Sequence, residues 1–202
     1  MIHHYALRIA HFALFVMLIF SMSNSVEAVP FTRTQMDKIF LDAGQAPSTN
    51  STLDLNVETF KGKFNGLITP ILQQTMGSND VSAMAHLFLI KDYKIFSKTD
   101  GDLFANIFAD YRVALVGLSE SNGGNFKSLN LYYTTPEAKD ESLFTVWFLT
   151  AFVKSITPDV DAQSLMGELT AENSSGSVIK SGVKYSISDE GNLNVLTAVK
   201  AE

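Results

Sequence analysis

The sequence LFTVWFLTAFV, residues 143–153, contains no charged side chain. Upstream, Thr135 is suited to cap a helix and Pro136 to occupy its first turn, while Pro158 is expected to stop the helix downstream. A helix that is apolar around its whole circumference is buried on most sides. The run is shorter than the roughly twenty apolar residues that a bilayer-spanning helix needs. We therefore expect a long helix over 136–156 at the centre of the fold.

Segments with the composition of β-strands lie on both sides of this helix in the chain. The strongest turn signal is Asn122-Gly123-Gly124-Asn125, because Asn and Gly tolerate the positive φ of a tight hairpin. A second turn, Asp189-Glu190-Gly191-Asn192, predicts a hairpin near the C-terminus. The expected strands are residues 83–96, 111–119, 126–134, 178–188 and 193–199. Residues 102–108 are expected to form a further short strand, with a helical turn as the alternative.

Shorter helices are expected over residues 35–41, 57–74 and 159–169, where apolar side chains recur at helical spacing. Pro70 is expected to kink the second of these or to end it nearby. Because the strands are segregated and joined by hairpin turns, they favour an antiparallel sheet. The sequence thus predicts an α+β fold, in which a long buried helix and one or two further helices pack on one face of that sheet.

Two segments of the chain, residues 64–70 and 152–158, share Phe, Ile, Thr and Pro at equal spacing. This similarity indicates a weak internal duplication. The length of the chain favours a single domain. The predicted organisation is a cleaved signal peptide over 1–28, an N-terminal short helix and loop over 29–56, and a single α+β domain over 57–202.

The first 28 residues have the order of a secretory leader. Arg8 supplies positive charge ahead of an apolar core at 12–20, and a polar stretch follows. Val26 and Ala28 then occupy the −3 and −1 positions of a signal-peptidase site. We expect cleavage between Ala28 and Val29 and an exported protein, periplasmic or extracellular, without a stable membrane anchor after cleavage. The alternative is a retained anchor, for which the apolar run is short.

Composition excludes several kinds of chemistry. The chain has no cysteine, so thiol nucleophiles, thiolate metal sites and disulfides are absent, and the fold depends on packing. The net charge is −6 and the basic residues are scattered, which argues against a nucleic-acid partner. Of the four histidines, His86 alone lies outside the leader. A site that needs two imidazoles is therefore impossible in one mature chain.

Candidate catalytic and metal-binding groups are few. His86 could act as a general base, since its unperturbed pKa is near 6.5, and the alternative is a structural or surface histidine. Ser177 and Lys180 match a Ser-x-x-Lys pattern, but on an expected strand rather than at a helix start. The acidic pairs Asp100 with Asp102 and Asp159 with Asp161 could bind Ca²⁺, yet they lack the spacing of an EF-hand, and turn and helix-start roles explain them. We predict no metal and no cofactor.

Four aromatic residues of the central helix form the remaining candidate site. They could line an apolar ligand cavity between helix and sheet, although a helix packed on a sheet requires such residues in any case. The candidate ligand-binding residues are Phe144, Trp147, Phe148 and Phe152.

These observations lead to three hypotheses of function. The first is an exported non-catalytic binding protein, which binds a protein partner or an apolar small molecule. The second is a secreted hydrolase that depends on His86 or on a carboxylate pair. The third is a secreted inhibitor or virulence factor, for which the loop over 42–56 and the hairpin near 122–125 are natural contact points.

Overall fold

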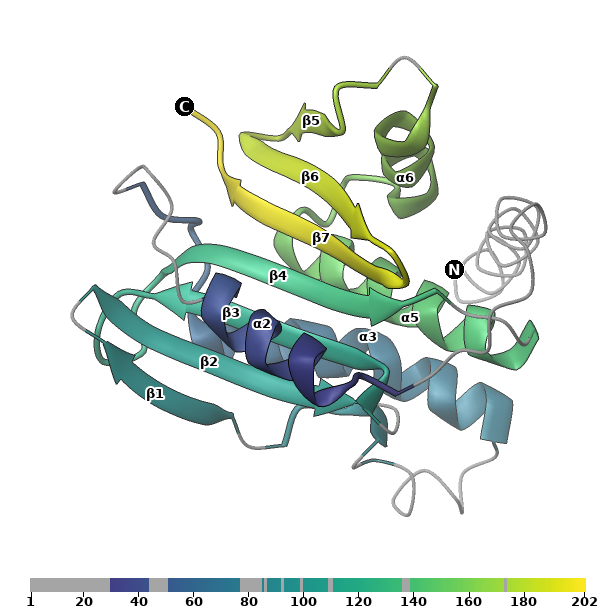
Figure 1. Ribbon diagram of the computed structural model, residues 1–202, viewed down its shortest axis with the longest axis horizontal. Helices are drawn as coiled ribbons and strands as arrows, with labels where there is room; N and C mark the ends of the chain where they lie inside the picture. Colours follow the sequence, from purple (N-terminus) through teal and green to yellow (C-terminus); the bar gives the residue numbers. More distant parts are fainter. Residues whose placement is uncertain are drawn as a thin grey trace.

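The computed structural model of the protein is an α+β fold with one antiparallel sheet (Figure 1), as the sequence predicts. The helices are α2 (Arg33–Ala43), α3 (Val57–Met76), α5 (Lys139–Ile156) and α6 (Ala162–Thr170). The strands are β1 (Lys94–Lys98), β2 (Gly101–Phe108), β3 (Val113–Ser119), β4 (Phe126–Thr134), β5 (Ser177–Lys180), β6 (Val183–Glu190) and β7 (Leu193–Lys200). The structure describes residues 30–43, 51–76, 85, 87–91, 93–98, 100–108, 111–135, 139–172 and 174–202. The expected leader and its cleavage site lie outside these residues.

The sheet joins two antiparallel meanders. One contains β1 to β4 and the other β5 to β7, and the pairing of β4 with β7 connects them in the order β1-β2-β3-β4-β7-β6-β5. In the chain, α3 precedes the first meander, and α5 followed by α6 precedes the second. Two related halves would give this arrangement. Of the two similar segments, 64–70 lies within α3 and 152–158 at the end of α5. These positions agree with a weak internal duplication but do not test it, and it stays a prediction.

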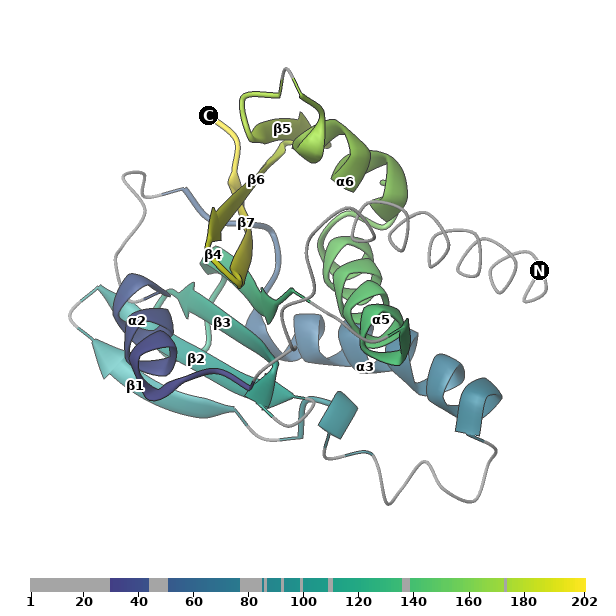
Figure 2. The same cartoon turned by 45° about the vertical axis from the view of Figure 1, so that its right-hand side comes forward.

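Helix α5 is the predicted central helix. Val146, Phe148 and Phe152 are 0 % exposed, and the helix ends at Ile156 as expected. Residues 136–138, at its expected start, lie outside the described residues. Helix α3 packs along α5 (Figure 2), and both share an apolar core with one face of the sheet. The long apolar helix is therefore buried by a second helix as well as by strands.

Helix α3 continues past Pro70 to Met76, so the helix does not end where the proline occurs. A proline inside a helix removes one backbone hydrogen bond and leaves the carbonyl four residues earlier without its partner. That carbonyl belongs to Gly66, and both Gly66 and Pro70 are exposed. Water can therefore satisfy the carbonyl, which explains why the helix tolerates the proline.

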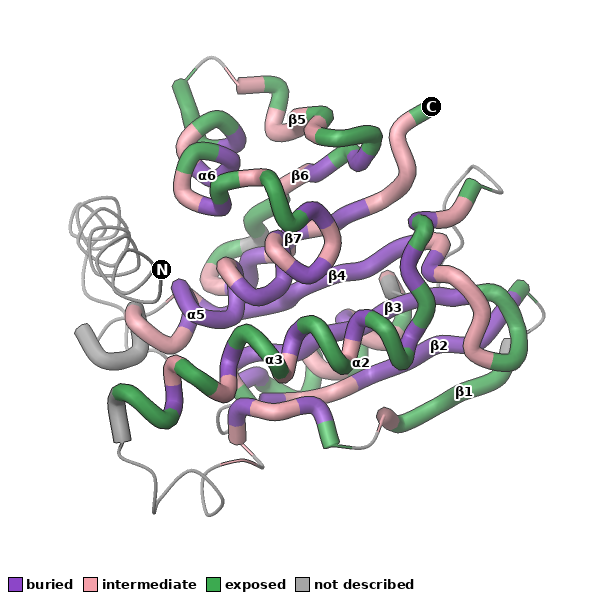
Figure 3. The backbone as a smooth tube through the Cα atoms, turned by 180° about the vertical axis from the view of Figure 1, so that it is seen from behind, coloured by how far each residue is buried: buried purple, intermediate pink, exposed green. Residues whose placement is uncertain are grey.

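Helix α2 covers the opposite face of the sheet, as Figures 1 and 3 show from the two sides. Successive side chains of a strand point to opposite faces, and β2 shows this directly. Leu103 and Ala105 pack in the cluster that contains Ile39 of α2, whereas Phe104 packs in the core shared with α3 and α5. The expected helix over 35–41 is thus confirmed, and it adds a smaller apolar layer on the second face of the sheet.

One expected strand is partly wrong. Among the described residues of 83–96, only those of β1 form a strand, and Ala85, Leu87 and Phe88 form a helical turn closed by a 2.8 Å bond from the Leu89 N–H to the Ala85 carbonyl. A short apolar run fits a buried helical turn as well as a buried strand. Tertiary contacts decide here, because the ring of Phe88 packs against Phe144 at 5.0 Å between centroids.

The expected strand over 178–188 is in fact two strands. Ser181 and Gly182 adopt positive φ values of 50° and 74° and reverse the chain between β5 and β6. Two consecutive residues with positive φ define the hairpin turn that matches the twist of the flanking strands. The second expected hairpin, β6 to β7, is confirmed, with Gly191 in its turn at φ 72°.

The strongest predicted turn is also confirmed. Asn122 and Gly123 have φ values of 61° and 72° between β3 and β4. The backbone N–H of Asn122 donates to the carboxylate of Asp102 over 2.8 Å. The segment that precedes α3 closes this end of the sheet, because Leu53 N–H donates to the Phe126 carbonyl and Phe126 N–H to the Leu55 carbonyl.

Candidate functional site

The four aromatic residues predicted to bind a ligand lie in or beside the core. Phe148 is 0 % exposed and contacts Phe108 at 4.9 Å between centroids, while Phe152 contacts Phe60 at 6.3 Å. Trp147 is buried, and Phe144 is half-buried at the edge of the same cluster, 5.2 Å from the Trp147 ring. These rings fill the space between helix and sheet with one another, as core packing requires.

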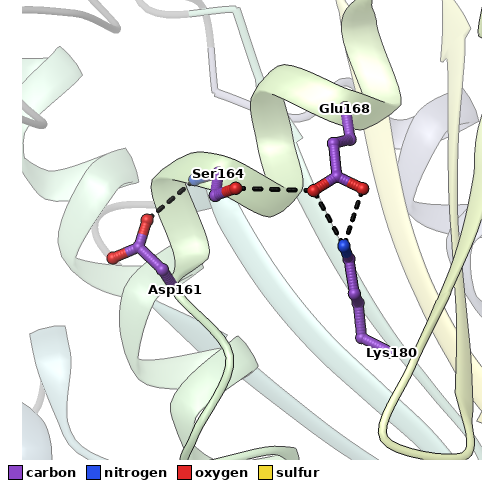
Figure 4. A network of polar contacts seen from close by, with 4 residues as sticks. All are labelled: Asp161, Ser164, Glu168 and Lys180. Atoms are coloured by element: carbon purple, nitrogen blue, oxygen red, sulfur yellow. Dashed lines mark hydrogen bonds and ion pairs between the residues drawn. The ribbon is translucent and has the colours of Figure 1, made fainter.

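Two of the four acidic candidates, Asp102 and Asp161, accept hydrogen bonds from backbone N–H groups. The carboxylate of Asp102 is held by the Asn122 turn, and Asp161 caps α6 by accepting the N–H of Ser164 over 2.8 Å (Figure 4). Asp100 and Asp159 are exposed. Within the described ranges, no three His, Cys, Asp or Glu residues are grouped so as to hold a metal ion.

The lysine of the Ser-x-x-Lys candidate, Lys180, forms an ion pair with Glu168. The Nζ of Lys180 lies 2.8 Å from each carboxylate oxygen of Glu168, and one of these oxygens also accepts the hydroxyl of Ser164 (Figure 4). The pair joins β5 to α6. His86 lies outside the described residues, so the structure does not place it relative to any of these groups.

The pKa is raised for three tyrosines, of which Tyr133 and Tyr185 are buried and Tyr93 is half-buried. Burial raises the pKa of Tyr185 to about 12, although the hydrogen bond between its hydroxyl and that of Thr157, 2.7 Å long, lowers it in part. Burial also raises the pKa of Tyr133, and burial together with the charge of Glu58 raises that of Tyr93. These hydroxyls stay protonated near neutral pH, so they are not general bases there, and the hydroxyl of Tyr185 serves as a hydrogen-bonding group of the core.

A different part of the molecule exposes large apolar side chains. Ile95 is 58 % exposed and Phe96 is 46 % exposed, and both lie on β1 at the end of the sheet. Figure 3 shows β1 as an exposed border beside the buried strands β2, β3 and β4. Among the described residues β1 pairs only with β2, so one side of its backbone has no strand partner. An edge of this kind can pair with an added strand.

Helix α2 extends this border. The ring of Phe40 meets that of Phe96 edge to face at 6.0 Å between centroids, and the next residue, Leu41, is 68 % exposed. Phe96 lies opposite Leu103 and therefore on the α2 face of the sheet, whereas Ile95 lies on the other face. We call Phe40, Lys94, Ile95 and Phe96 the β1 edge surface. It offers apolar contact on both faces of an open strand.

The opposite edge of the sheet is protected differently. Strand β5 has only four residues, and Lys180 is fixed to α6 by its ion pair with Glu168. Ile179 is 60 % exposed there. A very short edge strand with a helix beside it resists pairing with another chain. Strand β1 is longer and, in the part of the chain that the structure describes, no helix pairs an acidic side chain with Lys94.

The two contact segments of the inhibitor hypothesis occupy different environments. In the loop over 42–56, Leu53 and Leu55 are buried in the core, and residues 44–50 lie outside the described ranges. The hairpin near 122–125 is partly exposed. The β1 edge surface was not predicted, although a sequence signal exists in Lys-Ile-Phe-Ser-Lys, apolar residues between edge lysines.

The groups of this surface are suited to binding a polypeptide. Backbone donors and acceptors, two aromatic rings and a lysine can all contact another chain. Comparisons with protein-family models, with curated proteins and with solved structures find no match to the chain. None of the described helices is both long enough and apolar enough to cross a membrane.

Proposed function

We propose that this chain is an exported, non-catalytic binding protein that recognises a protein partner through the β1 edge surface. The observation that carries the proposal is the exposure of Ile95 and Phe96 on an open strand. Most other large apolar residues of the described chain are buried in its two apolar clusters. Exposed apolar groups that are contiguous, rather than scattered, are typical of interaction sites.

A protein partner fits this surface better than an apolar small molecule does. Small-molecule sites are concave and enclose most of their ligand. The β1 edge surface is instead the outer border of a sheet, open on one side and apolar on both faces. The aromatic rings around Phe148, which would line an internal cavity, are packed against one another.

The proposed location rests on the leader-like order of residues 1–28. Positive charge, an apolar core and small residues before Val29 are the features that secretory leaders share. A chain without cysteine folds in the periplasm or outside the cell without needing a particular redox state. Export therefore agrees with the composition of the whole chain.

The test compares matched variants at the two edges of the sheet. The protein is purified from its native host, and native mass spectrometry records what each variant retains. Ile95→Asp places a charge on β1, and Ile179→Asp places one on β5 at a residue of nearly equal exposure, 60 % against 58 %. We expect the wild type and Ile179→Asp to retain the same partner chain, and Ile95→Asp to lose it.

Two results would overturn the proposal. One is a partner chain retained equally by Ile95→Asp, and the other is a retained small molecule in place of a partner chain. The same spectra report the first residue of the mature protein, which we expect to be Val29. Circular dichroism of each variant checks that the fold is intact.

A further inference from the structure

We infer that the partner adds an extended segment to β1 as an eighth strand, and that this segment carries acidic side chains on either side of an apolar one. The inference rests on the proposed function and specifies its partner. Its first support is the open backbone of β1, which ends the sheet of seven strands. Strand addition satisfies such backbone groups with main-chain hydrogen bonds, and the side chains then determine specificity.

The second support is the charge on the strand. Strand β1 carries Lys94 and Lys98 and no acidic residue, in a chain whose net charge is −6. Lys94 is exposed. At physiological ionic strength, charges act over about 8 Å, so the exposed Lys94 attracts an acidic segment docked on β1 although the net charge of the whole chain is negative. The added strand should therefore be acidic.

The third support is the alternation of the strand. In the strand register, positions 94 and 96 lie opposite Ala105 and Leu103 of β2 and so belong to the α2 face, and position 98 follows two residues further along β1. On this face the ring of Phe96, in contact with Phe40, lies between two lysine positions. The matching partner thus has an acidic, an apolar and an acidic residue at alternate positions. On the opposite face, Ile95 favours a second apolar residue in the partner, at a position between one acidic residue and the first apolar residue.

A second copy of this chain does not meet these requirements. If two β1 strands paired antiparallel about Phe96, position 94 of each would lie opposite position 98 of the other, and the sequence has lysine at both positions. In a parallel pairing in register, each lysine would face its own counterpart. Like charges directly opposite on neighbouring strands are destabilising, and edge lysines are a common device against self-pairing. In these two registers the lysines of β1 therefore disfavour self-pairing, and they favour an acidic partner.

The test uses two synthetic peptides with the whole purified protein. The acidic peptide has Glu, Phe and Glu at alternate positions, with Val and Thr between them, and the basic peptide has Lys in place of each Glu. Binding is measured by titration calorimetry, and amide hydrogen exchange by NMR reports the protection of β1. Lys94→Glu is compared with Lys184→Glu, which changes an exposed lysine on β6.

We expect the acidic peptide to bind and to slow the exchange of β1 amides. Lys94→Glu should weaken this binding about fivefold or more and should reduce the preference for the acidic over the basic peptide, because the variant strand carries one charge of each sign. Lys184→Glu should leave binding unchanged. Added salt should weaken binding to the wild type.

Three results would overturn the inference: no binding of the acidic peptide, equal binding by Lys94→Glu, or binding without protection of β1. None of these results decides the proposed function. That function is tested separately, by whether Ile95→Asp loses or retains the native partner. If Ile95→Asp loses that partner while the acidic peptide fails to bind, the surface is an interaction site that does not use strand addition.

Discussion

The side-chain amide of Asn65 pairs with both backbone groups of Ile90. Its Nδ2 donates to the Ile90 carbonyl over 2.8 Å, and its Oδ1 accepts the Ile90 N–H over 2.9 Å. Ile90 is 1 % exposed, so water cannot easily replace either bond. Asn65 lies on α3, and Ile90 follows the helical turn that contains Phe88. The amide therefore fixes the segment that leads into β1, and with it the β1 edge surface, to the core helix.

Replacing this amide should destabilise the protein. Asn65→Ala leaves a buried donor and a buried acceptor without partners, which costs about 1–3 kcal/mol for each unsatisfied group. We expect the free energy of unfolding, measured by urea denaturation, to fall by about 2 kcal/mol or more. Lys63→Ala, at an exposed position of the same helix, is the matched control and should change stability by less than about 0.5 kcal/mol. Equal effects of the two variants would contradict the role given to Asn65.

The buried tyrosines predict a loss of stability in alkali. Burial raises the pKa of Tyr185 from 10.0 to about 12 in the folded protein, so the unfolded chain releases its proton first. The stabilising contribution is complete below pH 10 and is lost as the pH rises toward 12. Tyr133 and Tyr93 are shifted in the same direction and add to this loss.

Tyr185→Phe isolates one part of this effect. At neutral pH it removes the bond to Thr157, whose hydroxyl keeps a 3.2 Å bond to the Val153 carbonyl, so we expect a cost of about 1 kcal/mol. Above pH 10 the stability of the variant should fall less steeply than that of the wild type. Urea denaturation at a series of pH values compares the slopes. Parallel curves for the two proteins would contradict this prediction, because Tyr185 would then have the same pKa in the folded and the unfolded protein.

Two glycines should respond in opposite ways to replacement by alanine. Gly101 begins β2 with φ 141°, and an added Cβ would lie 1.9 Å from the carbonyl oxygen of Ser119. Gly101→Ala should therefore cost about 2 kcal/mol or more, because both the backbone and the neighbouring strand must move. Gly62 lies on the exposed face of α3, where, apart from the adjoining residues and backbone of the helix itself, nothing lies within 4 Å of such a Cβ. Gly62→Ala should raise the free energy of unfolding by up to about 1 kcal/mol. Thermal unfolding of both variants checks the contrast.

Local sequence signals predicted the elements whose pattern is unambiguous. The charge-free run over 143–153 indicated the buried helix because no amphipathic surface helix has that composition. Asn122 and Gly123 indicated their turn because few other residues adopt positive φ. The Ser181-Gly182 turn carries the same kind of signal, but it lies within a longer alternating segment that predicts one continuous strand. A turn of two residues interrupts the alternation too briefly for periodicity to show it.

Other features depend on contacts between distant segments. The helical turn at Phe88 is selected by Phe144 and Phe148, which lie far away in the chain. Periodicity within residues 83–96 contains no information about those rings. The β1 edge surface depends on strand order, since a strand lies at the edge of a sheet only when no other strand pairs with its second side. No local signal specifies that β1 ends the sheet, whereas the flanking lysines become meaningful once the order is known.

The lysines of β1 should keep the protein from associating with itself. If like charges prevent two β1 strands from pairing, then Lys94→Thr combined with Lys98→Thr removes the repulsion and leaves Ile95 and Phe96 exposed. Threonine also favours the strand conformation, so the edge itself should persist. We expect this double variant to form dimers or larger species at concentrations at which the wild type is monomeric, as measured by analytical ultracentrifugation.

The matched control removes charge without opening an edge. Lys184→Thr changes an exposed lysine of β6, a strand that is paired on both sides with β5 and β7. It should stay monomeric under the same conditions. Adding Ile95→Asp to the double variant should restore the monomer, because the new charge returns like-charge repulsion to the same border. Association that persists in this triple variant would place the contact elsewhere, and the lysines would then have no part in keeping β1 free for its partner.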